Sequence, residues 1–161
     1  MDVHRFIVFL SLLLVGIALQ VRSAEWVGWH VDAALVVLII AACWISVLEE
    51  AFLVIVAVAL MNWRPGFAPE LIFFAAFPLL IALLGPYMPW RRMVAILGAT
   101  MLGIMLMYVI VGGIAVITPH GFLWKDIGVS ALFALVLSRV VRSIYGLKGR
   151  VARGAFYILP R

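Results

Sequence analysis

The sequence predicts an all-α integral membrane protein, a bundle of about six transmembrane helices in which the second and third are short; five helices are the alternative. Hydrophobic residues make up 68% of the 161 residues, and charged residues only 12%. Soluble domains are about 45–50% apolar and about 25% charged. Because a small soluble domain leaves much of its surface exposed, a chain of this composition could not hide its apolar groups from water. The apolar residues also fall into long runs separated by prolines, tryptophans and charges.

The first apolar run extends from Phe6 to Val21 and follows a short, positively charged head. A positive head followed by an apolar stretch and small residues is also typical of a cleaved signal peptide. We expect this run to be retained as the first helix of the bundle. The cleaved alternative stays open at the level of the sequence.

The second and third runs extend from Ala33 to Leu48 and from Ala51 to Met61, with Glu49 and Glu50 between them. A single helix over residues 33–61 would be about 43 Å long, well beyond a hydrocarbon core of about 30 Å. It would also carry two carboxylates near its middle, each costing at least about 2.5 kcal/mol at that depth. We therefore predict a tight hairpin with the glutamates at a cytoplasmic turn. The merged helix is the five-span alternative.

The later runs are separated by clear breaks. Residues 62–70 contain two prolines and a glycine, which end a helix and favour a turn. The fourth run covers Leu71 to Pro89, the fifth covers Met93 to Thr118, and the sixth begins at Ile127. Tryptophans lie near the expected helix ends, as the aromatic belts of membrane proteins do: Trp26, Trp29, Trp63, Trp90 and Trp124.

The distribution of basic residues predicts the orientation. With six spans and both termini in the cytoplasm, nine of the 12 Lys and Arg residues fall inside, namely Arg5, Arg91, Arg92, Arg139, Arg142, Lys148, Arg150, Arg153 and Arg161. Three fall outside: Arg22, Arg64 and Lys125. Positive charge concentrates on the cytoplasmic side of membrane proteins. We expect a transmembrane bundle over residues 1–145 and a basic cytoplasmic tail over residues 146–161.

Three groups of residues are candidates for a functional role. Ala95, Ala99 and Gly103 recur at every fourth position of the fifth run, a spacing that lets two helix backbones approach closely in lipid. This face packs either within the bundle or against another membrane protein. Glu49 and Glu50 are either polar residues of a solvated turn or an ion or proton site, since carboxylates at membrane depth are commonly functional.

The third group is basic and lies at the end of the chain. Lysine and arginine residues near the cytoplasmic leaflet attract anionic lipid at about 1 kcal/mol each. The alternative is that they contact a partner protein. The group consists of Arg139, Arg142, Lys148, Arg150 and Arg153.

The sequence contains no motif that indicates catalysis. The histidines His4, His30 and His120 are far apart and lack the spacing of a metal site. Cys43 is the one cysteine, so no disulfide is expected. The net charge is +5, but the basic residues do not form a basic face on a soluble domain. We therefore do not expect nucleic-acid binding. We expect no enzymatic activity, no cofactor and no metal.

The order of the segments resembles the rod-shape-determining MreD family of bacterial inner-membrane proteins. In that family the second helix opens with an acidic residue before an aliphatic run, as in the stretch from Val31 and Asp32 to Leu38 here. The family's next helix begins Gly-Phe and continues with a second glycine and an aspartate; of these, only Phe52 is present. The resemblance implies a non-catalytic scaffold or accessory subunit of a complex for cell-shape or cell-wall assembly, with other integral membrane proteins as partners.

Transport is the rival function. The MreD layout is itself similar to that of the substrate-binding subunits of energy-coupling-factor vitamin transporters. Those subunits use a small-residue motif on the first helix, which the stretch from Phe6 to Gly16 lacks. A transporter also needs polar groups at membrane depth, and Ser46, Thr100 and Ser138 are the few that the runs provide. We therefore expect association rather than transport.

Overall fold

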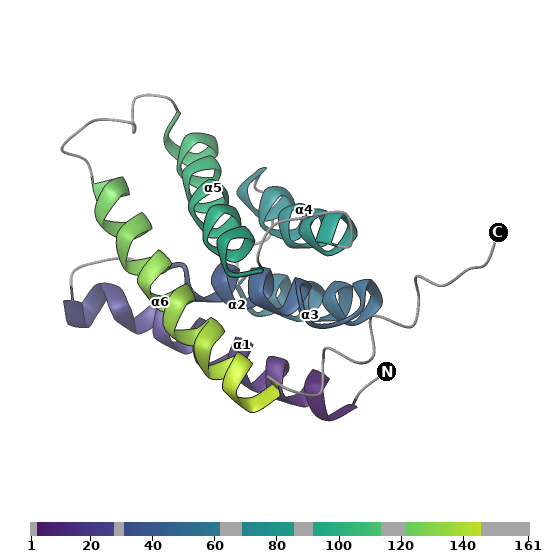
Figure 1. Ribbon diagram of the computed structural model, residues 1–161. Helices are drawn as coiled ribbons and strands as arrows, with labels where there is room; N and C mark the ends of the chain where they lie inside the picture. The colour runs from purple at the N-terminus through teal and green to yellow at the C-terminus, as the bar shows by residue number, and fades with distance from the viewer. Residues whose placement is uncertain (1–2, 28–30, 62–68, 86–91, 114–121, 146–161) are drawn as a thin grey trace.

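A computed structural model describes residues 3–27, 31–61, 69–85, 92–113 and 122–145, and it confirms the all-α prediction for these residues. They contain no strand. The six helices, shown in Figure 1, are α1 (Val3–Val27), α2 (Ala33–Ala42), α3 (Val47–Met61), α4 (Pro69–Leu84), α5 (Arg92–Gly112) and α6 (Phe122–Tyr145).

Three of the helices are long and apolar enough to cross a membrane. The apolar spans are Val3–Ser23 in α1, Met93–Val111 in α5 and Leu123–Tyr145 in α6, with 21, 19 and 23 residues. A span of 19 residues is about 28 Å long, close to the thickness of the hydrocarbon core. The other helices have 10, 15 and 16 residues. The lengths therefore support three spanning helices and do not by themselves establish six.

The long helices turn large apolar side chains outward. Only 17%, 22% and 39% of the residues in the apolar windows of α1, α5 and α6 are buried in the protein. Soluble monomers rarely expose contiguous apolar surface on this scale. Lipid is the solvent that suits these faces, whose exposed residues include Ile7, Leu14, Val15, Val94, Leu102, Val111, Leu132, Val136 and Ile144.

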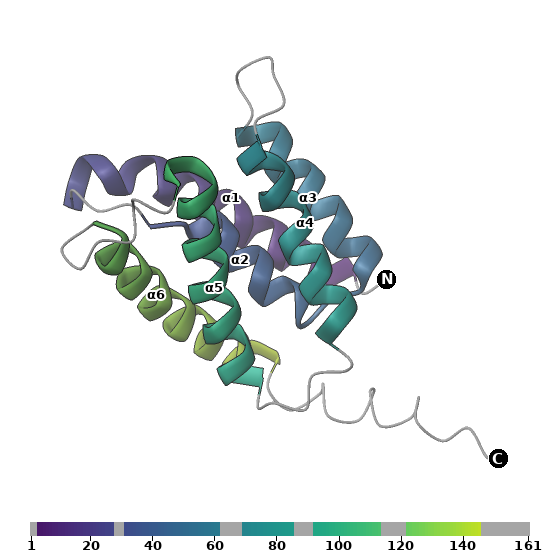
Figure 2. The ribbon, with the colours of Figure 1, turned by 90° about the horizontal axis from the view of Figure 1, so that it is seen from above.

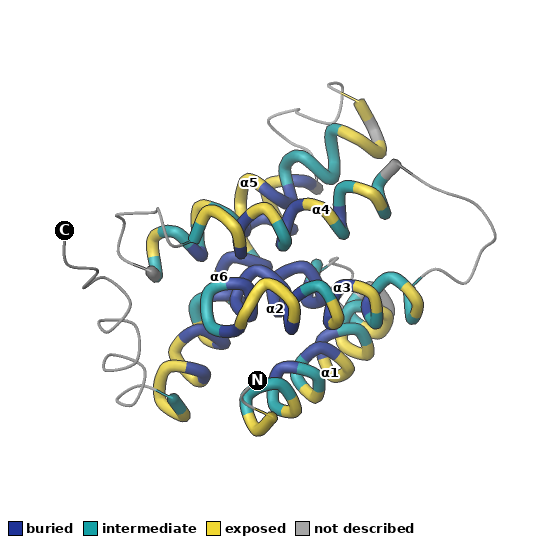
Figure 3. Tube along the Cα trace, turned by 90° about the vertical axis from the view of Figure 1, so that its right-hand side faces the viewer, coloured by how far each residue is buried: buried dark blue, intermediate teal, exposed yellow. Residues whose placement is uncertain are grey.

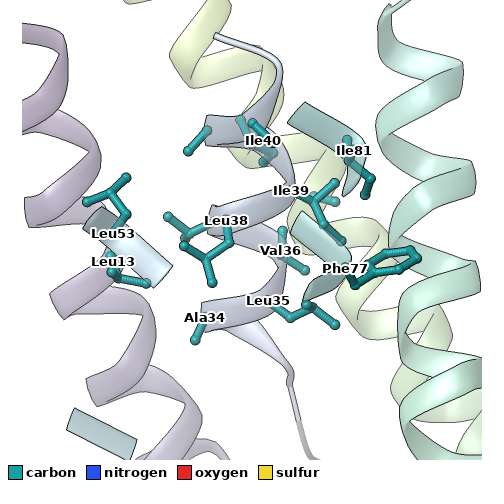
Figure 4. Close-up of a cluster of buried hydrophobic side chains, with 14 of the residues drawn as sticks. Leu13, Ala34, Leu35, Val36, Leu38, Ile39, Ile40, Leu53, Phe77 and Ile81 are labelled. Atoms are coloured by element: carbon teal, nitrogen blue, oxygen red, sulfur yellow. The ribbon is translucent and has the colours of Figure 1, made fainter. Parts of the chain in front are cut away.

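Helix α2 lies at the centre of the bundle and contacts each of the other five helices. All ten of its residues are buried, so its trace is dark blue throughout in Figure 3. A helix that is apolar on every side is stable only when it is enclosed. Leu38 lies toward Leu13 of α1 and Leu53 of α3, while Ile39 lies toward Phe77 of α4 (Figure 4). The core of the protein is therefore built around α2.

The remaining helices pack around this centre in chain order. α3 and α4 lie side by side as an antiparallel pair, and α5 packs against α6 (Figure 2). The start of α1 and the end of α6 lie together, because the guanidinium carbon of Arg5 is 5.8 Å from the ring centre of Tyr145. Residues 5 and 145 are thus at the same end of the bundle.

Three predicted boundaries are wrong. The second helix ends at Ala42 instead of Leu48, and the third begins at Val47 instead of following Glu50. The turn lies at residues 43–46 because Ser46 begins a new helix, as described below. The sixth helix begins at Phe122, before the predicted start at Ile127, and so includes Asp126.

Candidate functional site

The polar groups that matter most lie at the two ends of α2. A helix of ten residues is about 15 Å long, half of a hydrocarbon core of about 30 Å. The first amide groups and the last carbonyl groups of a helix have no partner within that helix. In lipid, such groups must find partners inside the protein. At the C-terminal end, backbone amides of the following turn donate to the carbonyl groups of Ile40 and Ala41. The N-terminal end depends instead on side chains of the surrounding helices.

The N-terminal cluster consists of Gln20, Asp32, Tyr108, Asp126 and Ser130. Gln20 of α1 accepts a hydrogen bond from the Ala34 amide through its side-chain oxygen, at 3.1 Å. The Asp32 amide donates to the Ser130 hydroxyl of α6, at 3.3 Å. The Asp32 side chain makes no capping hydrogen bond of its own. The cap of α2 therefore comes from α1, in place of the usual side chain at the helix start.

Tyr108 and Asp126 form a second contact in the N-terminal cluster. The Tyr108 hydroxyl of α5 donates to the Asp126 carboxylate of α6. Asp126 is buried, with 2% of its surface exposed. The Asp32 carboxylate lies close enough to Tyr108 for an electrostatic interaction. This part of the cluster ties α5, α6 and the start of α2 together through polar contacts.

The C-terminal cluster consists of Ser46, Glu49 and Glu50. The backbone amide and the hydroxyl of Ser46 both donate to Oε2 of Glu49, at 2.9 Å each. The Glu49 amide lies 3.4 Å from the Ser46 hydroxyl oxygen, to which it donates. This reciprocal pattern is a capping box, which satisfies amide groups at both positions. It fixes the start of α3 and explains why the chain turns before Glu49.

The prediction that the glutamates lie at a solvated turn is wrong. Glu49 is 8% exposed and Glu50 is fully buried. Glu50 belongs to the inward stripe of α3 together with Leu53, Val54 and Ala57, at helical spacing. The glutamates therefore lie in the packed first turn of α3, and Glu50 occupies a position that normally suits an apolar side chain.

An aromatic cluster closes the same end of the bundle. Tyr145 of α6 stacks on Phe9 of α1 at 6.5 Å between ring centres, and Trp44 lies 6.4 Å from Tyr145. Arg5 lies over the Tyr145 ring, and His4 meets its edge at 6.4 Å. A cation over an aromatic face contributes roughly 0.5–1 kcal/mol at an exposed site. This cluster joins α1, the turn after α2 and the end of α6.

The small residues predicted as a packing face have an internal partner. Gly103 is buried, and a Cβ atom built there would lie 2.7 Å from Cε1 of Phe77 in α4. Ala99 packs against the core, and Ala95 is half-buried. The contact with Phe77 within the bundle thus explains why a small residue stands at position 103. A surface for another protein is not required to explain it.

The other predicted residues are not brought into one site. Arg139 and Arg142 are exposed on the last turns of α6. Lys148, Arg150 and Arg153 lie outside the described residues, as do His30 and His120. Among the described residues there is no group of three or more potential metal ligands.

The sequence-based interpretation missed Gln20, Tyr108 and Ser130, and it began the sixth helix after Asp126. Gln20 could have been found, because it is a polar residue within the apolar first run. Because helix α6 starts earlier than predicted, Asp126 lies within its first turns, buried against Tyr108. Gln20, Tyr108, Asp126 and Ser130 therefore gather near the start of α2.

The N-terminal cluster can hold the start of α2 in place, and the bonds between Ser46 and Glu49 hold the start of α3. The arrangement also presents one buried carboxyl group whose oxygens have no hydrogen-bond partner, that of Glu50. It does not assemble a nucleophile, a general base and an orienting group within the described residues. Comparisons with known proteins find no matching family model, no matching curated protein and no matching solved structure.

Proposed function

We propose that the protein is a non-catalytic accessory subunit of a bacterial envelope complex, a six-helix bundle of the inner membrane that acts by associating with other membrane proteins. Both termini then face the cytoplasm. The observation that carries this proposal is the position of α2: an apolar helix, buried along its whole length, fills the centre of the bundle. What is left for recognition is the outer surface.

The interior of the bundle favours association over ligand binding. A small-molecule site is concave and has several polar groups that converge on the ligand. The side chains around α2 are instead packed and apolar, as in the cluster of Leu13, Leu38 and Phe77 (Figure 4). In the N-terminal cluster, the Gln20 and Tyr108 side chains are engaged in hydrogen bonds within the protein. These groups serve the fold.

The assignment to an envelope complex is supported by the resemblance to the MreD family in segment order. It is consistent with the exposed arginines Arg139 and Arg142 at the end of α6, which suit the anionic cytoplasmic leaflet. One observation favours the second candidate, a transporter subunit. Glu50 is a buried carboxyl group without a partner, and such groups mark ion pathways in many membrane proteins.

Photocrosslinking in the native membrane tests this proposal. A diazirine amino acid is placed at the outward positions Leu14 of α1, Leu102 of α5 and Leu132 of α6, and at the buried neighbour Leu13 as the matched control. We expect discrete protein adducts, identified by mass spectrometry, from at least one outward helix face and none from Leu13. Adducts with lipid alone at all three outward positions, together with solute uptake by vesicles containing only this chain, would establish the transporter instead.

A further inference from the structure

Glu50 has a position that the proposed function does not use. None of its surface is exposed, and neither carboxylate oxygen has a hydrogen-bond partner. It lies on the inward stripe of α3, one turn before Leu53 and Val54. Replacing it with leucine would give a simple apolar stripe. A glutamate at this position therefore calls for a chemical explanation.

The ionised form of Glu50 is not compatible with this packed arrangement. An isolated carboxylate in an apolar environment is so costly that the group takes up a proton. The donors at the start of α3 are directed to the neighbouring residue, because Oε2 of Glu49 accepts two hydrogen bonds from Ser46. The two donors of Ser46 are thus engaged by Glu49, and neither carboxylate oxygen of Glu50 receives a hydrogen bond. The packed state thus contains a neutral Glu50.

No described side chain of the elements around α3 forms a hydrogen bond with Glu50. α3 packs against α1, α2 and α4. α2 carries no ionisable residue between Ala33 and Ala42. The ionisable groups of these elements and the turn whose side chains the structure describes are His4, Arg5, Arg22, Asp32, Cys43, Glu49 and Glu70. None of them forms a hydrogen bond with the Glu50 carboxyl group.

We propose that Glu50 is a binding site for an exchangeable proton, occupied while the first turn of α3 is packed and emptied when that turn separates from α1 and α2. On release, the O–H bond of the carboxyl group breaks, the proton passes to water, and the carboxylate is hydrated. A metal ion fits less well, because the described residues provide no group of three or more ligands. The site couples pH to the position of the α2–α3 turn, and it goes beyond the proposed association.

The first test is labelling with a hydrophobic carbodiimide, which reacts with protonated carboxyl groups in apolar surroundings. The full-length protein in lipid nanodiscs is treated from pH 5 to pH 9, and adducts are located by mass spectrometry. We expect modification at Glu50 that declines as the pH rises, little at Glu49, and none at position 50 in the Glu50→Gln variant. Absence of modification at Glu50 at every pH, or equal modification of both glutamates, would overturn the proposal.

The second test uses Cys43, which lies half-buried in the turn. Its alkylation rate is measured against pH in the wild-type protein and in Glu50→Gln, whose amide cannot release a proton. The ionisation of the thiol itself affects both proteins, so the ratio of the two rates isolates Glu50. We expect the ratio of the wild-type rate to the Glu50→Gln rate to rise roughly ten-fold between pH 6 and pH 9. This corresponds to about 1.4 kcal/mol in the free energy of opening the turn. A ratio that stays constant contradicts the proposal. Neither test involves a partner protein, so this inference and the proposed association can fail separately.

Discussion

Replacing Gly103 with leucine should strongly destabilise the bundle. The first added carbon would lie 2.7 Å from Cε1 of Phe77, and the rest of the side chain would have to displace that ring from the α4–α5 contact. Overpacking of a core costs about 1–3 kcal/mol, and we expect a loss near the upper end because Phe77 also belongs to the core around α2. The midpoint of thermal unfolding in detergent measures it.

Gly98 is the matched control for this prediction. It lies on the same helix, and a Cβ atom built there would meet nothing within 4 Å. Gly98→Leu should leave the unfolding midpoint unchanged or raise it slightly, because leucine favours the helix by up to about 1 kcal/mol over glycine. Equal losses in the two variants would show that α5 does not pack against α4 through Gly103.

The Tyr108→Phe variant should lose about 1.5–3 kcal/mol of stability, the range for hydrogen bonds to charged groups. The substitution removes the hydroxyl that donates to the Asp126 carboxylate while keeping the aromatic ring. Asp126 is buried, so water does not readily replace the lost donor. Chemical unfolding in mixed micelles provides the measurement.

A double-mutant cycle separates this hydrogen bond from general effects of the substitution. In an Asp126→Asn background the acceptor is neutral, and the cost of Tyr108→Phe should fall by at least about 1 kcal/mol. Equal costs in both backgrounds would mean that the two side chains do not depend on each other. The N-terminal cluster would then not be held by this pair.

Much of the fold could be predicted from the sequence. The long helices α1, α5 and α6 are predicted by long apolar runs that prolines and charged residues delimit. Recognising such runs needs no tertiary information. The α2–α3 boundary was misplaced because two adjacent glutamates were interpreted as the turn itself. The Ser46-x-x-Glu49 spacing is a capping-box signature and was the local signal for a helix start at Val47.

The candidate site was harder to predict because it depends on contacts between distant segments. Gln20 caps Ala34 across 14 positions of the chain, and Ser130 accepts from Asp32 across 98. The central position of α2 is likewise a property of packing. Its composition indicates burial but does not say that five helices surround it. The burial of Glu50 likewise depends on packing, since α3 lies against α1, α2 and α4.

Cysteine accessibility along α2 tests most directly whether the centre of the bundle is closed. In a Cys43→Ala background, single cysteines replace Ala34, Val37 and Ala41, which are fully buried, and Leu48, which is 85% exposed at the start of α3. Membrane-impermeant thiol reagents are applied to either side of sealed vesicles. We expect labelling of Leu48→Cys from the cytoplasmic side alone and no labelling of the three α2 positions from either side. Labelling of Val37→Cys or Ala41→Cys would reveal a water path to the centre and would contradict the account of a closed bundle that works through association.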